Sequence, residues 1–243
     1  MGEPTVIYIT GDLHGEIGRL KSDAVKKLKK SDVLIVCGDF GFIWDGSEKE
    51  QKELKKIGKL KPQILFIAGC HDNYELLAKY PEVSLYGGKA RQISGKLHEL
   101  LRGEIYTIDD KKIFTFGGGI SEDSVMREEG NTWWKEENPT DQEFEYAITN
   151  LAEHQNEVDY VITHDTSLSL KQFINMEKGH EEIGNIHAFL NALGKNVNFK
   201  AWFFGKYHQD KTIPPRYYAV FQSVIKAPDQ DPKRKKKQKV KSE

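Results

Sequence analysis

Cysteines are scarce in this sequence, and long apolar runs are absent from it. Its 243 residues include two cysteines, Cys37 inside the apolar run VLIVC and Cys70 after a glycine, so we expect no disulfide framework and a reducing compartment. No stretch approaches the roughly 20 apolar residues of a membrane span. Residues 1–10 lead directly into a strand-like segment, without the pattern of a signal peptide. These absences predict a cytoplasmic protein that makes no membrane contact.

Charge is nearly balanced overall but unevenly distributed. The net charge is −1, yet residues 227–243 carry seven Lys and Arg against three acids, which leaves residues 1–226 at −5. With two prolines and almost no apolar side chains, this stretch cannot bury enough surface to fold. We therefore expect one folded domain over 1–226 and a disordered basic tail over 227–243. The tail would allow contact with nucleic acid, but the acidic body does not favour it.

Strand and helix patterns alternate over the first eighty residues. The apolar runs VIYIT, VLIVCGD and ILFIAG predict strands that are buried on both faces. Helices are expected over 17–30, 47–60 and 72–79, and the second opens with a capping box from Ser47 to Glu50. This alternation predicts a parallel sheet with right-handed crossovers.

The pattern changes after residue 83. Residues 83–119 are predicted to form antiparallel strands with a turn at Asp109-Asp110, and 120–139 a long polar loop that faces the functional site. Then follow a predicted helix over 140–154, the strand VDYVITH, a helical region that ends at Gly194, and the strands AWFFG and YYAVFQSVI. The predicted fold class is α/β: two mixed parallel and antiparallel sheets packed together and flanked by helices, an αββα sandwich.

Five short polar segments stand where predicted strands end. They are Asp12-Leu-His14, Gly38-Asp39, Gly69-Cys70-His71-Asp72, His164 and Gly205-Lys206-Tyr207-His208. Side chains at the carboxyl ends of strands meet at one edge of an open α/β sheet. In extended chain residues i and i+2 point the same way, so Asp12 with His14, and Lys206 with His208, should be aimed together. Carboxylates and imidazoles gathered in this way need a neutralising cation, which predicts a metal site.

In order and composition these segments closely resemble the signature of the calcineurin-like metallophosphoesterases, which runs D-x-H, G-D, G-N-H-[D/E], H and G-H-x-H. The resemblance spans residues 12 to 208, and the WWKEE-P loop makes the chain similar to compact bacterial members. It implies a metal-dependent phosphoric ester hydrolase that cleaves a phosphomonoester or phosphodiester with metal-activated hydroxide. The implied cofactor is one or two divalent ions, with Mn²⁺ first and Zn²⁺, Fe or Ni²⁺ as alternatives. The implied partner is a small phosphate ester or a nucleotide.

The resemblance also implies a role for each matching residue. Five would be metal ligands: Asp12, His14 and His208 at the first ion, His164 at the second, and Asp39 between the two. His71 would act as general acid or transition-state donor, oriented by Asp72.

Two positions depart from the family pattern, because Cys70 and Lys206 stand where it has an Asn and a His that bind the second metal. Cys70 would ligate as a thiolate, which suits Zn²⁺ better than Mn²⁺, or is a small buried residue without that role. Lys206 would supply its charge in place of a metal, paired with Asp39, or would turn to solvent. We therefore expect about one tightly bound metal and reduced activity or altered specificity. The alternative is a catalytically impaired binding or regulatory protein on the same fold.

For some polar and aromatic residues the sequence allows two roles. Arg102 is a candidate for phosphate binding or a charge at a strand edge. Trp133 and Trp134 would stack on a base or clamp their loop onto the core. The remaining histidines are expected to be structural or solvated: His98, His154, His180 and His187.

Overall fold

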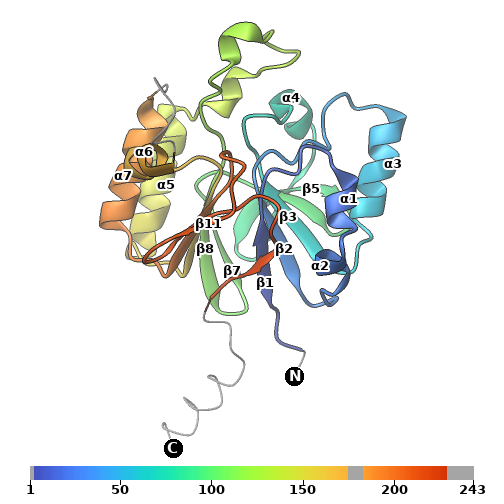
Figure 1. Ribbon diagram of the computed structural model, residues 1–243, viewed down its shortest axis with the longest axis horizontal. Helices are drawn as coiled ribbons and strands as arrows, with labels where there is room; N and C mark the ends of the chain where they lie inside the picture. The colour runs from blue at the N-terminus through green and yellow to red at the C-terminus, as the bar shows by residue number, and fades with distance from the viewer. Residues whose placement is uncertain (1–2, 175–182, 229–243) are drawn as a thin grey trace, which may run out of the picture.

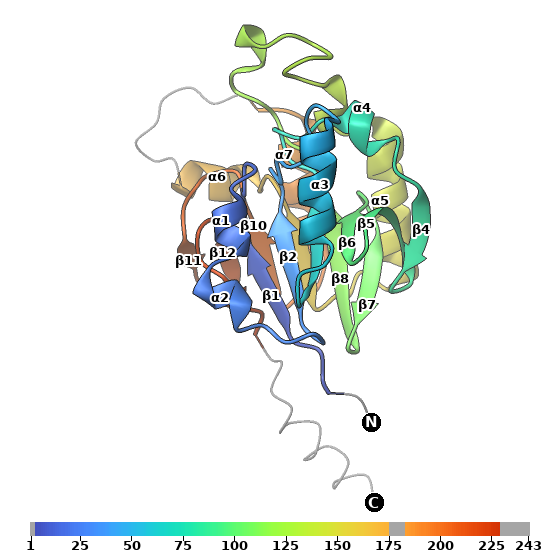
Figure 2. The same ribbon diagram turned by 90° about the vertical axis from the view of Figure 1, so that its right-hand side faces the viewer.

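The computed structural model describes residues 3–174 and 183–228. Two β-sheets pack face to face, and helices cover the outer face of each sheet (Figures 1 and 2). This arrangement confirms the predicted αββα sandwich with mixed sheets. Within the described ranges, no helix has the length and apolar character needed to cross a membrane.

The first sheet has the strand order β13-β1-β2-β3-β6-β5-β4. The bounds are β1 Ile7–Thr10, β2 Val33–Cys37, β3 Gln63–Ile67, β4 Glu82–Leu85, β5 Gly88–Ser94, β6 Leu97–Leu100 and β13 Ile225–Lys226. Strands β1, β2, β3 and β6 are parallel, whereas β13, β5 and β4 pair antiparallel with their neighbours. The helices on its outer side are α1 Ile17–Leu20, α2 Asp23–Lys26, α3 Glu48–Ile57 and α4 Tyr74–Leu77.

The second sheet has the order β11-β12-β10-β9-β8-β7. The bounds are β7 Ile105–Ile108, β8 Lys111–Phe116, β9 Tyr160–Thr163, β10 Ala201–Phe204, β11 Lys211–Ile213 and β12 Tyr217–Ala219. Its helices are α5 Asp141–Glu153, α6 Leu168–Ile174 and α7 Asn185–Asn196. Between β8 and α5 lie two 3₁₀ turns, η1 Ser124–Met126 and η2 Lys135–Glu137.

Alternation along the strands explains why the sheets are buried on both faces. In β2, Val33, Ile35 and Cys37 point into the core between the sheets, while Leu34 and Val36 pack against the helices outside. Strand β10 divides in the same way, because Phe203 faces the inner core and Trp202 faces α7. Fully apolar runs therefore suit these strands, which have no solvent face.

Several predicted boundaries were wrong. The helix expected over 17–30 is two short helices, since the Ser22 side chain accepts a hydrogen bond from the Val25 N–H and starts α2 anew. Gly194 lies inside α7, which is capped at Val197. The run YYAVFQSVI divides into β12 and β13, which belong to different sheets. The turn at Asp109-Asp110 is confirmed, with both residues at positive φ between β7 and β8.

Candidate metal centre

The polar segments meet at the carboxyl ends of the parallel strands, where the backbone adopts an unusual conformation. Asp12, His14, Asp39, Lys206 and His208 all have φ between 46° and 69°. This left-handed region is uncommon for residues other than glycine, and such strain collects at functional sites. The predicted convergence of Asp12 with His14 is therefore correct, but a left-handed turn produces it rather than extended chain.

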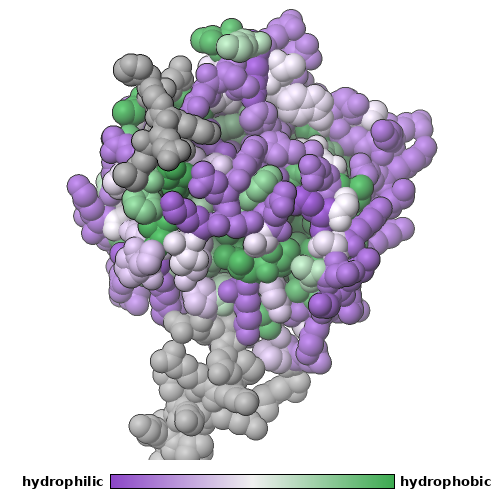
Figure 3. Space-filling view, viewed as in Figure 1, coloured by the Kyte–Doolittle hydropathy of each residue, from purple (hydrophilic) through white to green (hydrophobic). Residues whose placement is uncertain are grey.

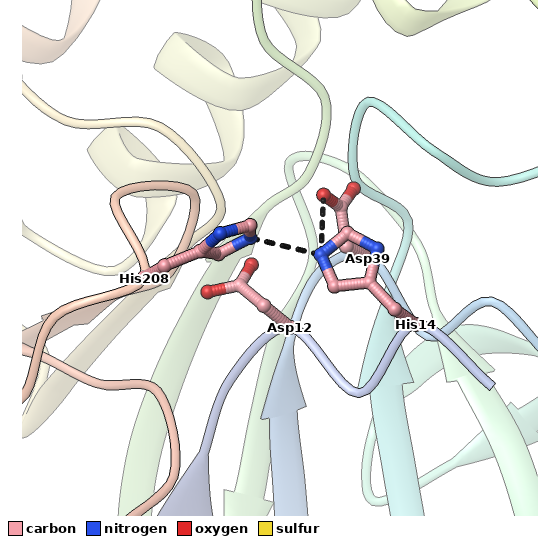
Figure 4. Close-up of side chains that lie close together, drawn as sticks. All are labelled: Asp12, His14, Asp39 and His208. Carbon is pink, nitrogen blue, oxygen red and sulfur yellow. Dashed lines mark hydrogen bonds and ion pairs between the residues drawn. The ribbon is translucent and has the colours of Figure 1, made fainter. Parts of the chain in front are cut away.

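Four side chains form what we call the metal cluster: Asp12, His14, Asp39 and His208. Each offers one ligand atom, and these atoms all lie within 4.8 Å of one another. His14 Nε2 is 2.9 Å from His208 Nε2 and 3.6 Å from Asp39 Oδ2. Figure 4 shows the four side chains grouped closely, with dashed lines from the His14 ring to His208 and to Asp39.

The electrostatics of this cluster suit a cation. Burial raises the pKa of Asp12 to about 7, and its Oδ2 atom has no hydrogen-bond donor among the described residues. Burial also lowers the pKa of both His14 and His208, which favours the neutral imidazoles that bind metals. Two carboxylates and two imidazoles fit Mn²⁺, Fe and Zn²⁺ alike.

Asp39 connects the metal cluster to His71. Its Oδ2 lies 2.9 Å from His71 Nδ1, and its Oδ1 accepts the His71 N–H at 2.8 Å. Burial raises the pKa of Asp39, but the nearby charge of His164 and the bond to His71 outweigh it, so the pKa lies below its usual range. Asp39 therefore remains a carboxylate that orients His71 by its Nδ1 edge.

The sequence predicts that Asp72 orients His71, and this is wrong. Asp72 is buried and accepts the backbone N–H groups of Phe40, Gly41 and Gly69. Asp72 turns inward to these backbone groups, while the His71 ring faces Asp39 of the cluster. Asp72 thus fixes the loops that carry Asp39 and His71.

His164 is fully buried behind the cluster. Its Nδ1 donates to the Cys37 carbonyl at 3.0 Å, and its Nε2 lies 3.3 Å from Asp39 Oδ1. Burial lowers its pKa, but Asp39 and Cys70 raise it well above the ordinary value. Only glycine fits at position 38, because a Cβ there would lie 2.1 Å from His164 Nδ1.

Beside His164 lies a second group, the ammonium cluster: Cys70, Asp165, His187 and Lys206. Lys206 Nζ donates to Cys70 Sγ at 3.2 Å and to the Ile120 carbonyl at 2.6 Å, and lies 3.9 Å from Asp165 Oδ2. His187 Nε2 is 3.3 Å from the same carboxylate oxygen. Burial lowers the pKa of Lys206, but Cys70 and Asp165 raise it well above its ordinary value.

This geometry corrects two expectations about Lys206. Its ammonium pairs with Cys70 and Asp165, and no ion pair with Asp39 occurs among the described residues. It also diverges from His208, because left-handed backbone at both residues breaks the i, i+2 alignment. The structure places Lys206 inward rather than in solvent, at the position next to Cys70.

Arg102 lies outside both clusters. Its guanidinium donates to the carbonyls of Gly117, Glu136 and Glu137 and to the Glu143 carboxylate. These acceptors occupy all three of its nitrogens, so Arg102 joins η2 and α5 to the strands instead of facing the metal cluster. It lines a separate cavity of about 650 Å³.

Trp134 clamps the long loop, since it is buried and packs edge-on against Trp44 with ring centroids 5.2 Å apart.

Among the other histidines, His187 is fully buried rather than solvated, whereas His180 lies outside the described residues. Ala227 is buried and donates its N–H to Ile7, so the ordered domain includes it; residues 229–243 of the expected tail lie outside the described residues.

Sequence reasoning missed three residues at the site: Arg127, Asp165 and His187. Asp165 follows directly after His164 and carries a charge, so its position was a usable signal. Arg127 contacts His71 from the long polar loop, 56 residues away in the chain. The predicted direction of that loop, toward the site, was its only sequence signal.

A family model shows what this chain is related to. A model of the calcineurin-like phosphoesterase family matches residues 5–210. No protein among the curated sequences matches the chain. Among solved structures, phosphopantetheinyl hydrolase from Mycobacterium tuberculosis is 13% identical, with 96% of this chain and 99% of that chain covered and a TM-score of 0.45. A protein of unknown function from Aquifex aeolicus is 14% identical, with 80% and 88% covered and a TM-score of 0.33.

Proposed function

Because the chain belongs to the calcineurin-like phosphoesterase family, we propose that it hydrolyses a phosphate ester with one divalent metal ion held by the metal cluster. The observation that carries this proposal is the convergence of four ligand atoms within 4.8 Å from Asp12, His14, Asp39 and His208. The resemblance to the family puts Mn²⁺ first, with Zn²⁺, Fe and Ni²⁺ as alternatives, and the donor set accepts each of them.

When bound, a divalent metal ion lowers the pKa of coordinated water to near neutrality and polarises phosphoryl oxygens. The chain's own groups provide the rest. His71 presents its Nε2 edge to the substrate, because Asp39 holds its Nδ1 edge at 2.9 Å. As general acid, His71 would carry its proton on Nε2, and the leaving-group oxygen of the substrate would take the place of Arg127 Nη2, which touches that atom in the free protein. Asp72 keeps the two loops in register through its three backbone hydrogen bonds.

Lys206 takes the place of a second metal in this proposal. Its ammonium already pairs with Asp165 and donates a hydrogen bond to Cys70 Sγ, at the two positions where the family pattern has second-metal ligands. A further divalent cation there would have to displace this buried charge, which is unfavourable. One ion per chain is therefore expected.

Metal content tests this proposal. Protein purified with Mn²⁺ should contain about one tightly bound ion per chain by elemental analysis, and Asp39→Asn should contain almost none. The double variant Lys206→His with Cys70→Asn should bind a second ion. Two ions in the unaltered protein would contradict the single-metal proposal.

Hydrolysis tests the activity itself. The protein should cleave p-nitrophenyl phosphate or its bis ester with Mn²⁺, Zn²⁺, Ni²⁺ or Mg²⁺ present, and Asp39→Ala should not. The buried ammonium at the second position favours one alternative, a binding protein that has lost turnover. If the unaltered protein shows no hydrolysis with any of these metals and the double variant is active, the result would support that alternative.

A further inference from the structure

The long segment between β8 and α5 brings a guanidinium to the edge of the metal centre. The segment rises above the strand ends (Figures 1 and 2), and η1 exposes Val125 and Met126 by 84% and 88%. Apolar surface is visible at the top of this segment in Figure 3. Arg127, the next residue, turns the other way, and its side chain is only 10% exposed. Burial of a charged side chain is costly, so its inward direction from an exposed segment must be offset by specific contacts.

Two sets of contacts fix the Arg127 guanidinium. Asp123 accepts a hydrogen bond from Nε at 2.9 Å and lies 2.7 Å from Nη2. Nη1 donates to the Cys70 carbonyl at 3.4 Å, and Nη2, the nitrogen that also pairs with Asp123, touches His71 Nε2. Asp123 therefore orients the forked guanidinium group, and this group lies against the Nε2 edge of His71.

This edge faces the position of the substrate. Asp39 occupies the Nδ1 side of His71, and the rings of His71 and His14 lie 5.4 Å apart. A phosphoryl group held between the metal cluster and His71 would thus present its remaining oxygens to Arg127. These contacts leave the second N–H of Nη1 for such an oxygen. Charge-assisted hydrogen bonds from a guanidinium to a phosphate oxygen are strong.

We propose that Arg127 binds the phosphoryl group beside His71 and thereby selects doubly charged phosphomonoesters over singly charged diesters. The proposal rests on the proposed hydrolase function. A monoester offers the fork a further charged oxygen, whereas in a diester that oxygen carries a second organic group. Asp123 is a positioning residue, because it acts on the substrate through Arg127.

Kinetics on two esters test this selection. Arg127→Ala should lower kcat/KM for p-nitrophenyl phosphate by about 10- to 100-fold, as expected for hydrogen bonds to a charged group. Its kcat/KM for the bis ester should change by less than about threefold, and the inhibition constant of inorganic phosphate should rise together with the monoester loss. Arg127→Lys and Asp123→Asn should show smaller losses in the same direction. Lys135→Ala, an exposed cation on the same segment, is the matched control and should match the unaltered protein.

The outcomes separate this proposal from the proposed function. Equal losses on both esters, or unchanged inhibition by phosphate, would overturn it. If the unaltered protein hydrolyses neither ester, calorimetry with inorganic phosphate on the Mn²⁺-bound protein decides. Phosphate binding that Arg127→Ala removes and Lys135→Ala keeps supports the site, whereas equal binding by all three proteins, or by none, rejects it. Unchanged metal content and melting temperature in Arg127→Ala show that the fold and the metal cluster are intact.

Discussion

The metal cluster and the ammonium cluster lie side by side but solve the same electrostatic problem differently. Both collect acidic groups at buried strand ends. In the ammonium cluster, Lys206 supplies the neutralising charge from the chain itself, at 3.2 Å from Cys70. In the metal cluster no Lys or Arg forms an ion pair with Asp12 or Asp39 among the described residues, and Asp12 Oδ2 has no donor there. The ammonium cluster thus holds a lysine as its own cation, whereas the carboxylates of the metal cluster form ion pairs only with imidazoles among the described residues.

Removing a carboxylate from the metal half should have the largest effect. Asp39→Asn should lower kcat/KM by about a thousandfold or more, because it weakens both the metal site and the orientation of His71. Steady-state kinetics and elemental analysis on the same samples measure this. Asp141→Asn, an exposed position on α5, should behave like the unaltered protein. Activity of Asp39→Asn within tenfold of the unaltered protein would refute the assignment.

Removing the charge from the ammonium half should affect stability instead. Lys206→Met should lower the free energy of unfolding of metal-free protein by about 3–5 kcal/mol, because it leaves buried Asp165 without its cation and Cys70 Sγ without its hydrogen-bond donor. Urea denaturation with EDTA present measures the loss. Lys79→Met, which removes an exposed pair with Glu75, should change stability by less than about 1 kcal/mol. Equal effects of the two variants would show that the buried ammonium contributes no special stability.

Added metal should stabilise the folded protein through the metal cluster only. Mn²⁺ at a hundred times its dissociation constant should add about 2.7 kcal/mol to the free energy of unfolding. Thermal denaturation with and without EDTA should show this gain in the unaltered protein and in Cys70→Ala. His208→Ala should lose most of it. A gain that depends on Cys70 would instead make the thiolate a metal ligand.

The smallest expected effect of a substitution is a gain in stability rather than a loss. In EDTA, Asp12→Asn should raise the free energy of unfolding by about 1 kcal/mol, since it removes a buried charge near Asp39 and keeps the oxygen that accepts the Lys206 N–H. Urea denaturation at pH 8 measures it, and Asp23→Asn, which is exposed, should leave stability unchanged. A loss of stability in Asp12→Asn would show that the metal cluster is already compensated without metal.

The sequence was sufficient for the sandwich and for the location of the centre. Apolar runs without alternation predicted strands buried on both faces, and polar residues at their ends predicted the edge where the site lies. Short helices and strand breaks were harder, because a single cap such as Ser22 decides where a helix restarts. Such local competition leaves little trace in periodicity.

Side-chain direction within the centre was largely beyond sequence reasoning. An assumption of extended backbone led to the expected pairing of Lys206 with Asp39, and left-handed turns redirect both Lys206 and His208. Asp72 and Arg102 were recognised as polar residues near the site, but their partners were not predicted. Asp72 accepts three backbone N–H groups, and Arg102 donates to the Gly117 carbonyl and the Glu143 carboxylate. Arg127 reaches His71 from a loop whose path no local pattern encodes.

The pairing of β13 with β1 bears on how the protein is made. The Thr10 hydroxyl donates to the carbonyl of Phe221, 211 residues further along the chain, and His14 meets His208 across 194 residues. Contacts this remote in sequence form late, because a long loop must close first. On the ribosome, the N-terminal strands emerge long before their partners. The proposed metal site, which needs His208, would therefore be completed only after translation of almost the whole domain, so the metal supply of the cell would act on the finished chain.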